Sequence, residues 1–280
     1  MIRILHLSDP HFGASDAAVE RAFIERVRHM HPDHTILSGD ITMRARRREY
    51  DEGRRFIASL PRPLLVIPGN HDVPALNQPV DRFFNPFRRY RKLIGPDLEP
   101  AFGDERIQIL SLNSTRAFGL HADWSDGFLS RRQLDRIGTE FANGDPSAFR
   151  ILVLHHPLLA PPGRQRALVK PLPDLLQAIT RSKIDLVLCG HFHTSQIATA
   201  GILDGWKCVV SQAPTVCSTR LQGEPQGFHE IVLSREGMTI IHHQFDGTEF
   251  IPVTEFGFSR TVSGWLDCAF QQSGEVVSLG

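Results

Sequence analysis

The sequence lacks an excess of charge and any long hydrophobic segment. Its 280 residues carry 31 Lys and Arg against 31 Asp and Glu. This balance argues against a protein that holds nucleic acid mainly by charge. No apolar run reaches the roughly 20 residues that a membrane-spanning helix needs, and the N-terminus lacks the pattern of a signal peptide. We therefore expect a cytoplasmic protein without a membrane span.

Cysteine is scarce as well. The four cysteines, Cys189, Cys208, Cys217 and Cys268, show no Cys-x-x-Cys spacing, so we expect reduced thiols rather than disulfides. Histidine, in contrast, occurs 14 times, and several copies stand beside Asp, Asn or Gly. Hydrophobic residues make up 41% of the chain, which is enough to bury a core.

Short apolar runs alternate with helical segments over the first two-thirds of the chain. The runs are apolar on both alternations, as expected for strands that are covered on both faces. They are Ile2–Leu7, His34–Ser38, Leu64–Ile67, Ile107–Leu112, Arg150–Leu154 and Ile184–Cys189. Apolar residues at helical spacing predict a helix over Val19–Met30, with Ser15 or Asp16 as its N-cap. They also predict helices at Arg47–Leu60, from Ser130 onward and at Asp174–Arg181.

The rest of the chain follows other patterns. Residues 74–104 are rich in proline and predict an inserted helix with loops. After about residue 200, Cys208–Ser211, Gly227–Leu233 and Met238–Gln244 predict antiparallel strands of a second sheet. We expect one α/β domain over residues 1–255, with two sheets between helical layers. Residues 256–280 carry weak signals and are interpreted as a C-terminal extension.

Five of the predicted strands lead directly into a polar cluster. The clusters are Asp9-Pro10-His11, Gly39-Asp40, Gly69-Asn70-His71-Asp72, His155-His156-Pro157 and Gly190-His191-Phe192-His193. Because ligands of α/β sheets bind outside the carboxyl ends of the strands, parallel strands would bring all five clusters to one rim. Asp, Asn and His side chains are ligands suited to Mn²⁺, Fe²⁺/Fe³⁺ or Zn²⁺.

The number of potential ligands exceeds the needs of one ion. Seven side chains qualify, namely Asp9, His11, Asp40, Asn70, His155, His191 and His193. One metal commonly takes about four to six ligands, some of them water. Two divalent ions that share one carboxylate would use all seven. Such a site keeps a net positive charge, which attracts a phosphate group.

Taken in order, the clusters resemble the five-block signature of the calcineurin-like metallophosphoesterases. The resemblance implies a two-sheet α/β/β/α sandwich, and hydrolysis of a phosphoester by a hydroxide that bridges two metal ions. The first metal would take Asp9, His11 and His193. The second would take Asn70, His155 and His191. Asp40 would bridge the ions, His71 would protonate the leaving oxygen or steady the phosphoryl group, and Asp72 would orient His71.

Smaller features point to a subgroup of this family. Glu49-Tyr50 and the segment 127–134 resemble members that cleave cyclic nucleotides or glycerophosphodiesters, which implies a small phosphodiester as substrate. Met43–Arg48 departs from the acidic or glycine-containing turn that is common there. A nuclease, a nucleotide-sugar-lipid pyrophosphatase and a metal-free scaffold remain as alternatives.

Several residues outside the clusters have two readings each. Arg44–Arg48 is either a solvated start of a helix or a grip on an anionic substrate. The aromatic stretch Phe83–Tyr90 is interpreted as core packing or as a contact in a homodimer, with a platform for the substrate as the alternative. Asn113, Arg116 and His121 are candidates for substrate contacts, although an Asn after a strand commonly forms a turn.

Overall fold

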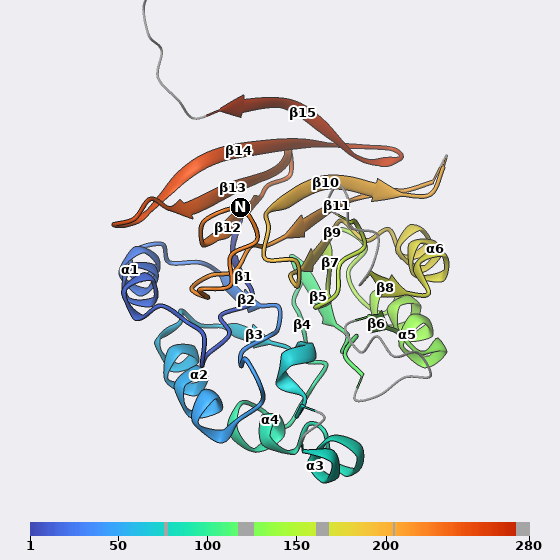
Figure 1. Ribbon diagram of the computed structural model, residues 1–280. Helices are drawn as coiled ribbons and strands as arrows, with labels where there is room; N and C mark the ends of the chain where they lie inside the picture. The colour runs from blue at the N-terminus through green and yellow to red at the C-terminus, as the bar shows by residue number, and fades with distance from the viewer. Residues whose placement is uncertain (76–77, 117–125, 161–167, 204, 273–280) are drawn as a thin grey trace, which may run out of the picture.

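The structure is a computed structural model that describes residues 1–75, 78–116, 126–160, 168–203 and 205–272. The main strands form one continuous 13-stranded sheet that folds into two layers, called here the first and the second sheet. The two layers pack face to face, and helices cover their outer faces (Figure 1). The two-sheet α/β/β/α sandwich predicted for the chain is confirmed. None of the helices in the described part of the chain is long and apolar enough to cross a membrane.

The first sheet combines parallel and antiparallel strands. Its parallel strands are β1 (Ile2–Leu7), β2 (His34–Leu37) and β3 (Leu64–Val66). Its antiparallel strands, in spatial order from β1, are β12 (Gly227–Leu233), β13 (Gly237–Phe245), β14 (Phe250–Thr261) and β15 (Gly264–Gln272). The buried strands β1 and β2 are apolar on both faces because the second sheet covers one face and helices cover the other.

The second sheet has a parallel centre and antiparallel edges. Its parallel strands are β5 (Ile107–Ser111), β7 (Phe149–Val153), β9 (Leu186–Cys189) and β11 (Lys207–Gln212). The edges are β4 (Ala101–Gly103) and β10 (Gln196–Gly201). A pairing of Lys207 with Gly264 connects this sheet to β15. Two short strands, β6 (Gly127–Phe128) and β8 (Val169–Lys170), pair separately.

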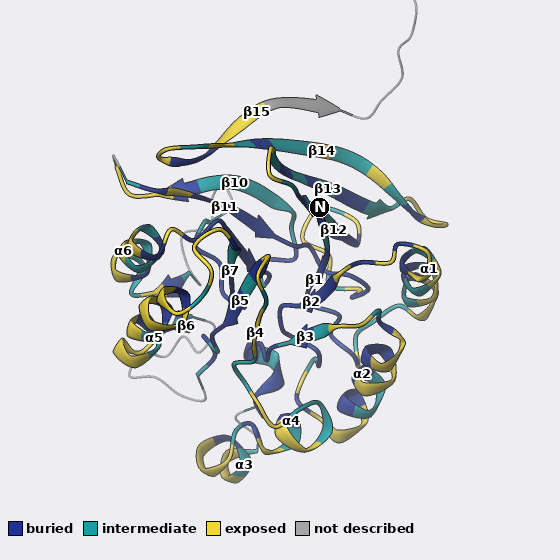
Figure 2. Ribbon diagram, turned by 180° about the vertical axis from the view of Figure 1, so that it is seen from behind, coloured by how far each residue is buried: buried dark blue, intermediate teal, exposed yellow. Residues whose placement is uncertain are grey.

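Four amphipathic helices cover the sheets. They are α1 (Ala17–Arg28) and α2 (Arg47–Ser59) on the first sheet, and α5 (Arg131–Ala142) and α6 (Leu172–Ser182) on the second. Their outer faces are exposed and their inner faces are buried (Figure 2). Asp16 and Ser130 cap α1 and α5 by accepting backbone N–H groups of the first turn, which satisfies donors that a helix leaves free.

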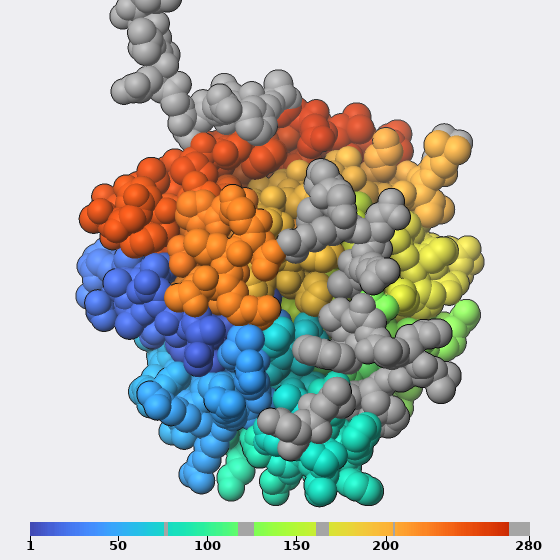
Figure 3. All heavy atoms as spheres, viewed as in Figure 1, coloured from blue at the N-terminus to red at the C-terminus, as the bar shows by residue number. Residues whose placement is uncertain are grey.

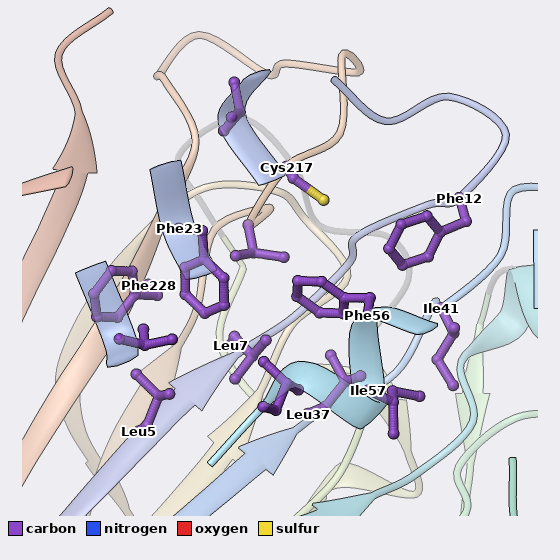
Figure 4. Close-up of a cluster of buried hydrophobic side chains, with 14 of the residues drawn as sticks. Leu5, Leu7, Phe12, Phe23, Leu37, Ile41, Phe56, Ile57, Cys217 and Phe228 are labelled. Carbon is purple, nitrogen blue, oxygen red and sulfur yellow. The ribbon is translucent and has the colours of Figure 1, made fainter. Parts of the chain in front are cut away.

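Aromatic and aliphatic side chains fill the layer between the first sheet and its helices (Figure 4). Phe23 of α1 and Phe56 of α2 lie with ring centroids 5.8 Å apart, and Leu5 and Leu37 face them from β1 and β2. Burying such side chains contributes about 1.5–3 kcal/mol each. This packing holds α2, and the loop that precedes it, against the ends of β1 and β2.

The structure differs from the sequence prediction after residue 200. β12 and β13 are antiparallel as expected, but they extend the first sheet, because β12 pairs with β1 from Ile2–Leu233 onward. β11 is a parallel strand of the second sheet beside β9. The boundary predicted at residue 255 falls inside β14, so residues 256–272 belong to the sheet. The insertion at 74–104 holds two short helices, α3 (Pro79–Phe84) and α4 (Arg88–Leu93).

Candidate metal centre

The parallel strands of both sheets end at one rim, and the predicted ligands follow those ends directly. Asp9 and His11 follow β1, Asp40 follows β2, Asn70 begins the single 3₁₀ turn η1 (Asn70–Asp72) after β3, His155 follows β7, and His191 and His193 follow β9. The structure therefore brings all seven side chains together. All but His191 are buried.

One group of donors contains Asp9, His11 and His193. The two Nε2 atoms of the histidines lie 2.8 Å apart. Asp9 Oδ1 lies 3.7 Å from Nε2 of His11 and 3.5 Å from Nε2 of His193. Three donor atoms from two strand ends that belong to different sheets thus converge on one point.

A second group contains Asn70, His155 and His191. Asn70 Oδ1 lies 3.1 Å from His155 Nε2 and 3.0 Å from His191 Nδ1, and the two ring nitrogens lie 3.3 Å apart. This group also draws on both sheets, since Asn70 follows β3 of the first sheet and the histidines follow strands of the second.

Asp40 lies between the two groups. Its Oδ2 is 3.5 Å from His11 Nε2 and 3.4 Å from His155 Nε2. Its Oδ1 accepts a hydrogen bond of 2.8 Å from the backbone N–H of His71. One carboxylate therefore faces both donor groups.

The hydrogen bonds of the histidine rings fit a pair of cations. His155 Nδ1 lies 2.9 Å from the Ser38 carbonyl and His193 Nδ1 lies 2.7 Å from the Arg220 carbonyl. A carbonyl only accepts, so Nδ1 of each ring donates, and Nε2 is left to give its lone pair to a metal in the centre once it has lost its proton. Asp9 Oδ1 is buried and has no hydrogen-bond partner in the described part of the chain. Lone pairs that face one another in this way fit metal ions.

The protonation states of the groups agree with this fit. Burial lowers the pKa of His11 to about 3 and that of His191 to about 4, so both rings are neutral at pH 7, as a metal ligand must be. Burial raises the pKa of a carboxyl, but the adjacent His155 outweighs this effect at Asp40 and holds its pKa below the ordinary value. Although burial opposes it, Asp40 raises the pKa of His155 to about 9. The proton on His155 therefore supplies the positive charge that a cation would supply once bound.

His71 and Asp72 lie beside the centre and contact different partners. His71 Nδ1 is 2.8 Å from the Met43 carbonyl. The Asp72 carboxylate accepts backbone N–H groups of Thr42 (2.9 Å) and Gly69 (2.9 Å). These contacts differ from the prediction that Asp72 orients the His71 ring. Asp72 ties together the loops that follow β2 and β3.

A cavity of about 310 Å³ opens on the side of His71. Its lining residues are Met43, Arg44, Asn70, His71, Val73, Ala75 and Arg82. The residues of the predicted cluster Arg44–Arg48 have different surroundings. Arg44 lines the cavity. Arg47 and Arg48 are exposed on α2, where Arg47 pairs with Asp51 and Arg48 pairs with Glu52. The cavity offers room for an organic group beside the donors.

The remaining predicted candidates have structural partners or lie elsewhere. Asn113 Oδ1 accepts the backbone N–H of Thr115 (3.0 Å), as a turn-forming Asn does. The Arg116 guanidinium stacks on the ring of Phe128, 3.0 Å from its centroid. His121 lies outside the described residues.

Sequence reasoning missed the loop over residues 213–226, between β11 and β12. Thr215 donates a hydrogen bond of 2.6 Å to the carbonyl of Asp9, and the Arg220 carbonyl accepts from His193. In the space-filling view this segment (orange) lies at the surface next to the N-terminal residues (blue) (Figure 3). The sequence carries no signal for these contacts, because Thr215 and Asp9 are 206 positions apart.

The fold and the donor set define a class of protein. The model of the calcineurin-like phosphoesterase family matches residues 2–195, and the chain belongs to this family. It is therefore a hydrolase that acts on phosphoesters, and the resemblance drawn from the five clusters is confirmed.

The relatives in sequence are phosphodiesterases. A probable cyclic nucleotide phosphodiesterase of Synechococcus is 28% identical over 74% of this chain and 74% of its own length. The 3′,5′-cyclic adenosine monophosphate phosphodiesterase CpdA of Escherichia coli K12 is 28% identical over 69% of this chain and 70% of its own. The glycerophosphodiester phosphodiesterase GpdQ of Enterobacter lignolyticus is 30% identical over 58% of this chain and 56% of its own.

Solved structures share the fold at low identity. The purple acid phosphatase PPD1 of yellow lupin superimposes with a TM-score of 0.62 at 14% identity, covering 98% of this chain and 57% of the lupin chain. GAP50 of Plasmodium gives a TM-score of 0.60 at 12% identity and covers 97% and 89% of the two chains. At these identities the likeness concerns the fold alone.

Proposed function

We propose that the protein is a dinuclear metal-dependent phosphodiesterase that hydrolyses a small diester, either a cyclic nucleotide or a glycerophosphodiester. The observation that carries the proposal is the position of Asp40, whose Oδ2 lies within 3.5 Å of a donor nitrogen in each of the two groups. The names of the relatives in sequence support a small diester as the substrate.

Each donor group would hold one ion. Asp9, His11 and His193 would bind the first, Asn70, His155 and His191 would bind the second, and Asp40 would contact both. The donors suit Mn²⁺, Fe²⁺/Fe³⁺ or Zn²⁺. When bound, two such ions would supply an activated water and neutralise charge on the phosphoryl oxygens.

The chain's own groups would orient the substrate and move protons. His71 would deliver a proton from Nε2 to the leaving oxygen in its doubly protonated form, in which Nδ1 donates to the Met43 carbonyl and Nε2 faces the substrate. Asp72 would keep the loop of His71 in place through the backbone of Thr42 and Gly69. The cavity beside His71 would receive an organic group of the diester.

The proposal includes a cytoplasmic protein, and the free thiols support it. Cys189, Cys208, Cys217 and Cys268 are all unpaired, as is usual in a reducing compartment. The balanced net charge argues against nucleic acid as the substrate. Whether the protein forms a homodimer is a separate question for solution scattering.

A substrate panel tests the proposed function. The protein is loaded separately with Mn²⁺, Fe²⁺ and Zn²⁺ and given bis(p-nitrophenyl) phosphate, cyclic nucleotides, glycerophosphodiesters, p-nitrophenyl phosphate, single-stranded DNA and nucleotide-sugar lipids. We expect two bound ions per chain and turnover of the small diesters above that of the monoester. Turnover of only DNA or only the lipids would replace the proposal with one of those activities. Silence with every substrate would favour a scaffold.

A further inference from the structure

Arg220 brings a guanidinium to the rim of the metal centre. Its Nη1 lies 3.4 Å from His71 Nε2 and 3.6 Å from Met43 Sδ. The His71 ring in turn meets the ring of His11 edge to face, with centroids 4.8 Å apart. A single imidazole therefore separates the guanidinium from a donor of the first metal group.

The neighbours of this guanidinium leave its charge available. His71 Nδ1 donates to the Met43 carbonyl, so Nε2 is the ring atom that faces Arg220, and it carries no negative charge. The thioether of Met43 carries no charge either. Among the described residues, no carboxylate lies within 4.0 Å of the guanidinium. The side chain is half-buried, which reduces the screening of its charge by water.

The backbone of Arg220 also contacts a residue of the metal centre. The Arg220 carbonyl accepts the hydrogen bond of 2.7 Å from His193 Nδ1, and the Arg220 N–H donates to Ser218 Oγ (3.1 Å). These backbone contacts place the residue next to the donor group and do not depend on its side chain. The orientation of His193 and the position of the guanidinium can therefore be tested apart.

We propose that Arg220 is a substrate-binding residue whose guanidinium contacts a non-bridging oxygen of the phosphoryl group, beside His71. The inference rests on the proposed function, because it places the phosphoryl group at the metal centre. Arginine suits this position, since its planar fork matches the geometry of phosphate oxygens. The contact would also stabilise the charge on those oxygens in the transition state.

The variant Arg220→Gln tests the inference, because it removes the charge and keeps the backbone. With the metal-loaded enzyme, kcat/KM for bis(p-nitrophenyl) phosphate should fall about 10- to 100-fold. This factor corresponds to the loss of one hydrogen bond to a charged group. The dissociation constant of inorganic phosphate, measured by calorimetry, should rise by a similar factor. The content of bound metal should stay at the wild-type level, since the carbonyl that orients His193 remains. Arg220→Lys should recover part of the loss.

Arg28→Gln is the matched control, since it removes the same charge from the end of α1. Arg28 is exposed and pairs with Glu25 at 3.3 Å, so both readouts should stay at wild-type values. Unchanged kcat/KM and phosphate affinity in Arg220→Gln would overturn the inference, and so would a loss of bound metal in that variant. If the wild-type enzyme turns over no phosphoester, the proposed function fails on its own. Phosphate calorimetry still decides whether Arg220 binds the anion.

Discussion

Several residues of the metal centre have a backbone conformation that side chains disfavour. Asp9, His11, Asp40, His191 and His193 have φ values of 54°, 49°, 50°, 79° and 59°. A non-glycine residue in the left-handed region costs on the order of 1–3 kcal/mol and persists only where its surroundings impose it. Here the imposing contacts include the Asp9 carboxylate, which accepts the backbone N–H of His191 at 2.9 Å. All five of these residues are candidate donors of the metal centre.

This conformation makes Asp40→Asn a clean test of the shared carboxylate. Asn tolerates the left-handed region much as Asp does, so the backbone is kept and a charge is lost. Changing a partner of a metal ligand typically costs about 10- to 100-fold, so replacing the shared carboxylate should lower kcat/KM by more than roughly 100-fold. Bound metal should fall from two ions to one or fewer. A variant with wild-type turnover and two ions would contradict the assignment of Asp40.

The close packing around Gly69 predicts the effect of a second substitution. A Cβ at this position would overlap the carboxylate and the backbone nitrogen of Asp40. Gly69→Ala should therefore displace Asp40, lower metal binding and activity together, and destabilise the fold by about 1–3 kcal/mol. Gly138 of α5 has open space around its Cα, so Gly138→Ala should be stabilising by about 0.5–1 kcal/mol. Denaturant unfolding and metal analysis of both variants check the pair.

At the scale of elements, a chain of buried histidines and serines joins the sheets beneath the metal centre. Ser211 Oγ of β11 lies 3.1 Å from Nδ1 of His6 in β1 and 2.8 Å from Nδ1 of His229 in β12. His6 Nε2 continues the chain to Ser38 Oγ at 3.0 Å. Both histidines are buried strand residues. A partner in the other sheet explains why polar groups persist inside the sandwich.

The neighbouring β12–β13 hairpin should make stability depend on pH. Burial lowers the pKa of His242 in β13 from 6.5 to about 4. The unfolded chain therefore takes up a proton before the folded chain does. Above pH 6.5 this group has no effect, and as the pH falls from 6.5 towards 4 the free energy of unfolding drops by about 1.4 kcal/mol per pH unit. Urea unfolding between pH 7 and 5 should show a shallower slope in His242→Leu than in wild type. Parallel curves would argue against this prediction.

The strands and helices were predictable where their pattern was local and strong. β1 and β12 have the predicted bounds, and α2 differs by one residue at its end. β14 and β15 were not predicted, because most of the described positions of β14 are only half-buried and give little alternation. The sheet and the direction of a strand depend on long-range pairing, and for this reason β12 and β13 were predicted in the wrong sheet and β11 was predicted antiparallel to its neighbours, although it is parallel to β9.

At the scale of the whole molecule, the metal centre joins the two sheets. Each donor group takes residues from both, as Asp9 with His193 and Asn70 with His155 show. Bound ions would therefore act as cross-links between sheets that otherwise meet through apolar packing.

Removal of the metals should accordingly lower thermal stability. A ligand present at 100 times its dissociation constant stabilises the folded state by about 2.7 kcal/mol. For a chain of this size that corresponds to roughly 5–10 °C in Tm. We expect EDTA to lower the Tm of the metal-loaded protein by this amount, and added Mn²⁺ to restore it. Asp40→Asn should show a smaller shift, and an equal Tm with and without chelator in the wild type would count against a metal centre.

The amino-acid sequence by itself determined which side chains are candidate donors and that they follow strand ends, because both are local properties of residue type and hydrophobic period. Only the tertiary structure decided that Asp40 faces both donor groups, that Asp72 holds a loop rather than the His71 ring, and that Arg220 reaches the rim. These relations join positions from about 30 to 149 residues apart. Their distances are set by how the two sheets pack, which no local pattern encodes.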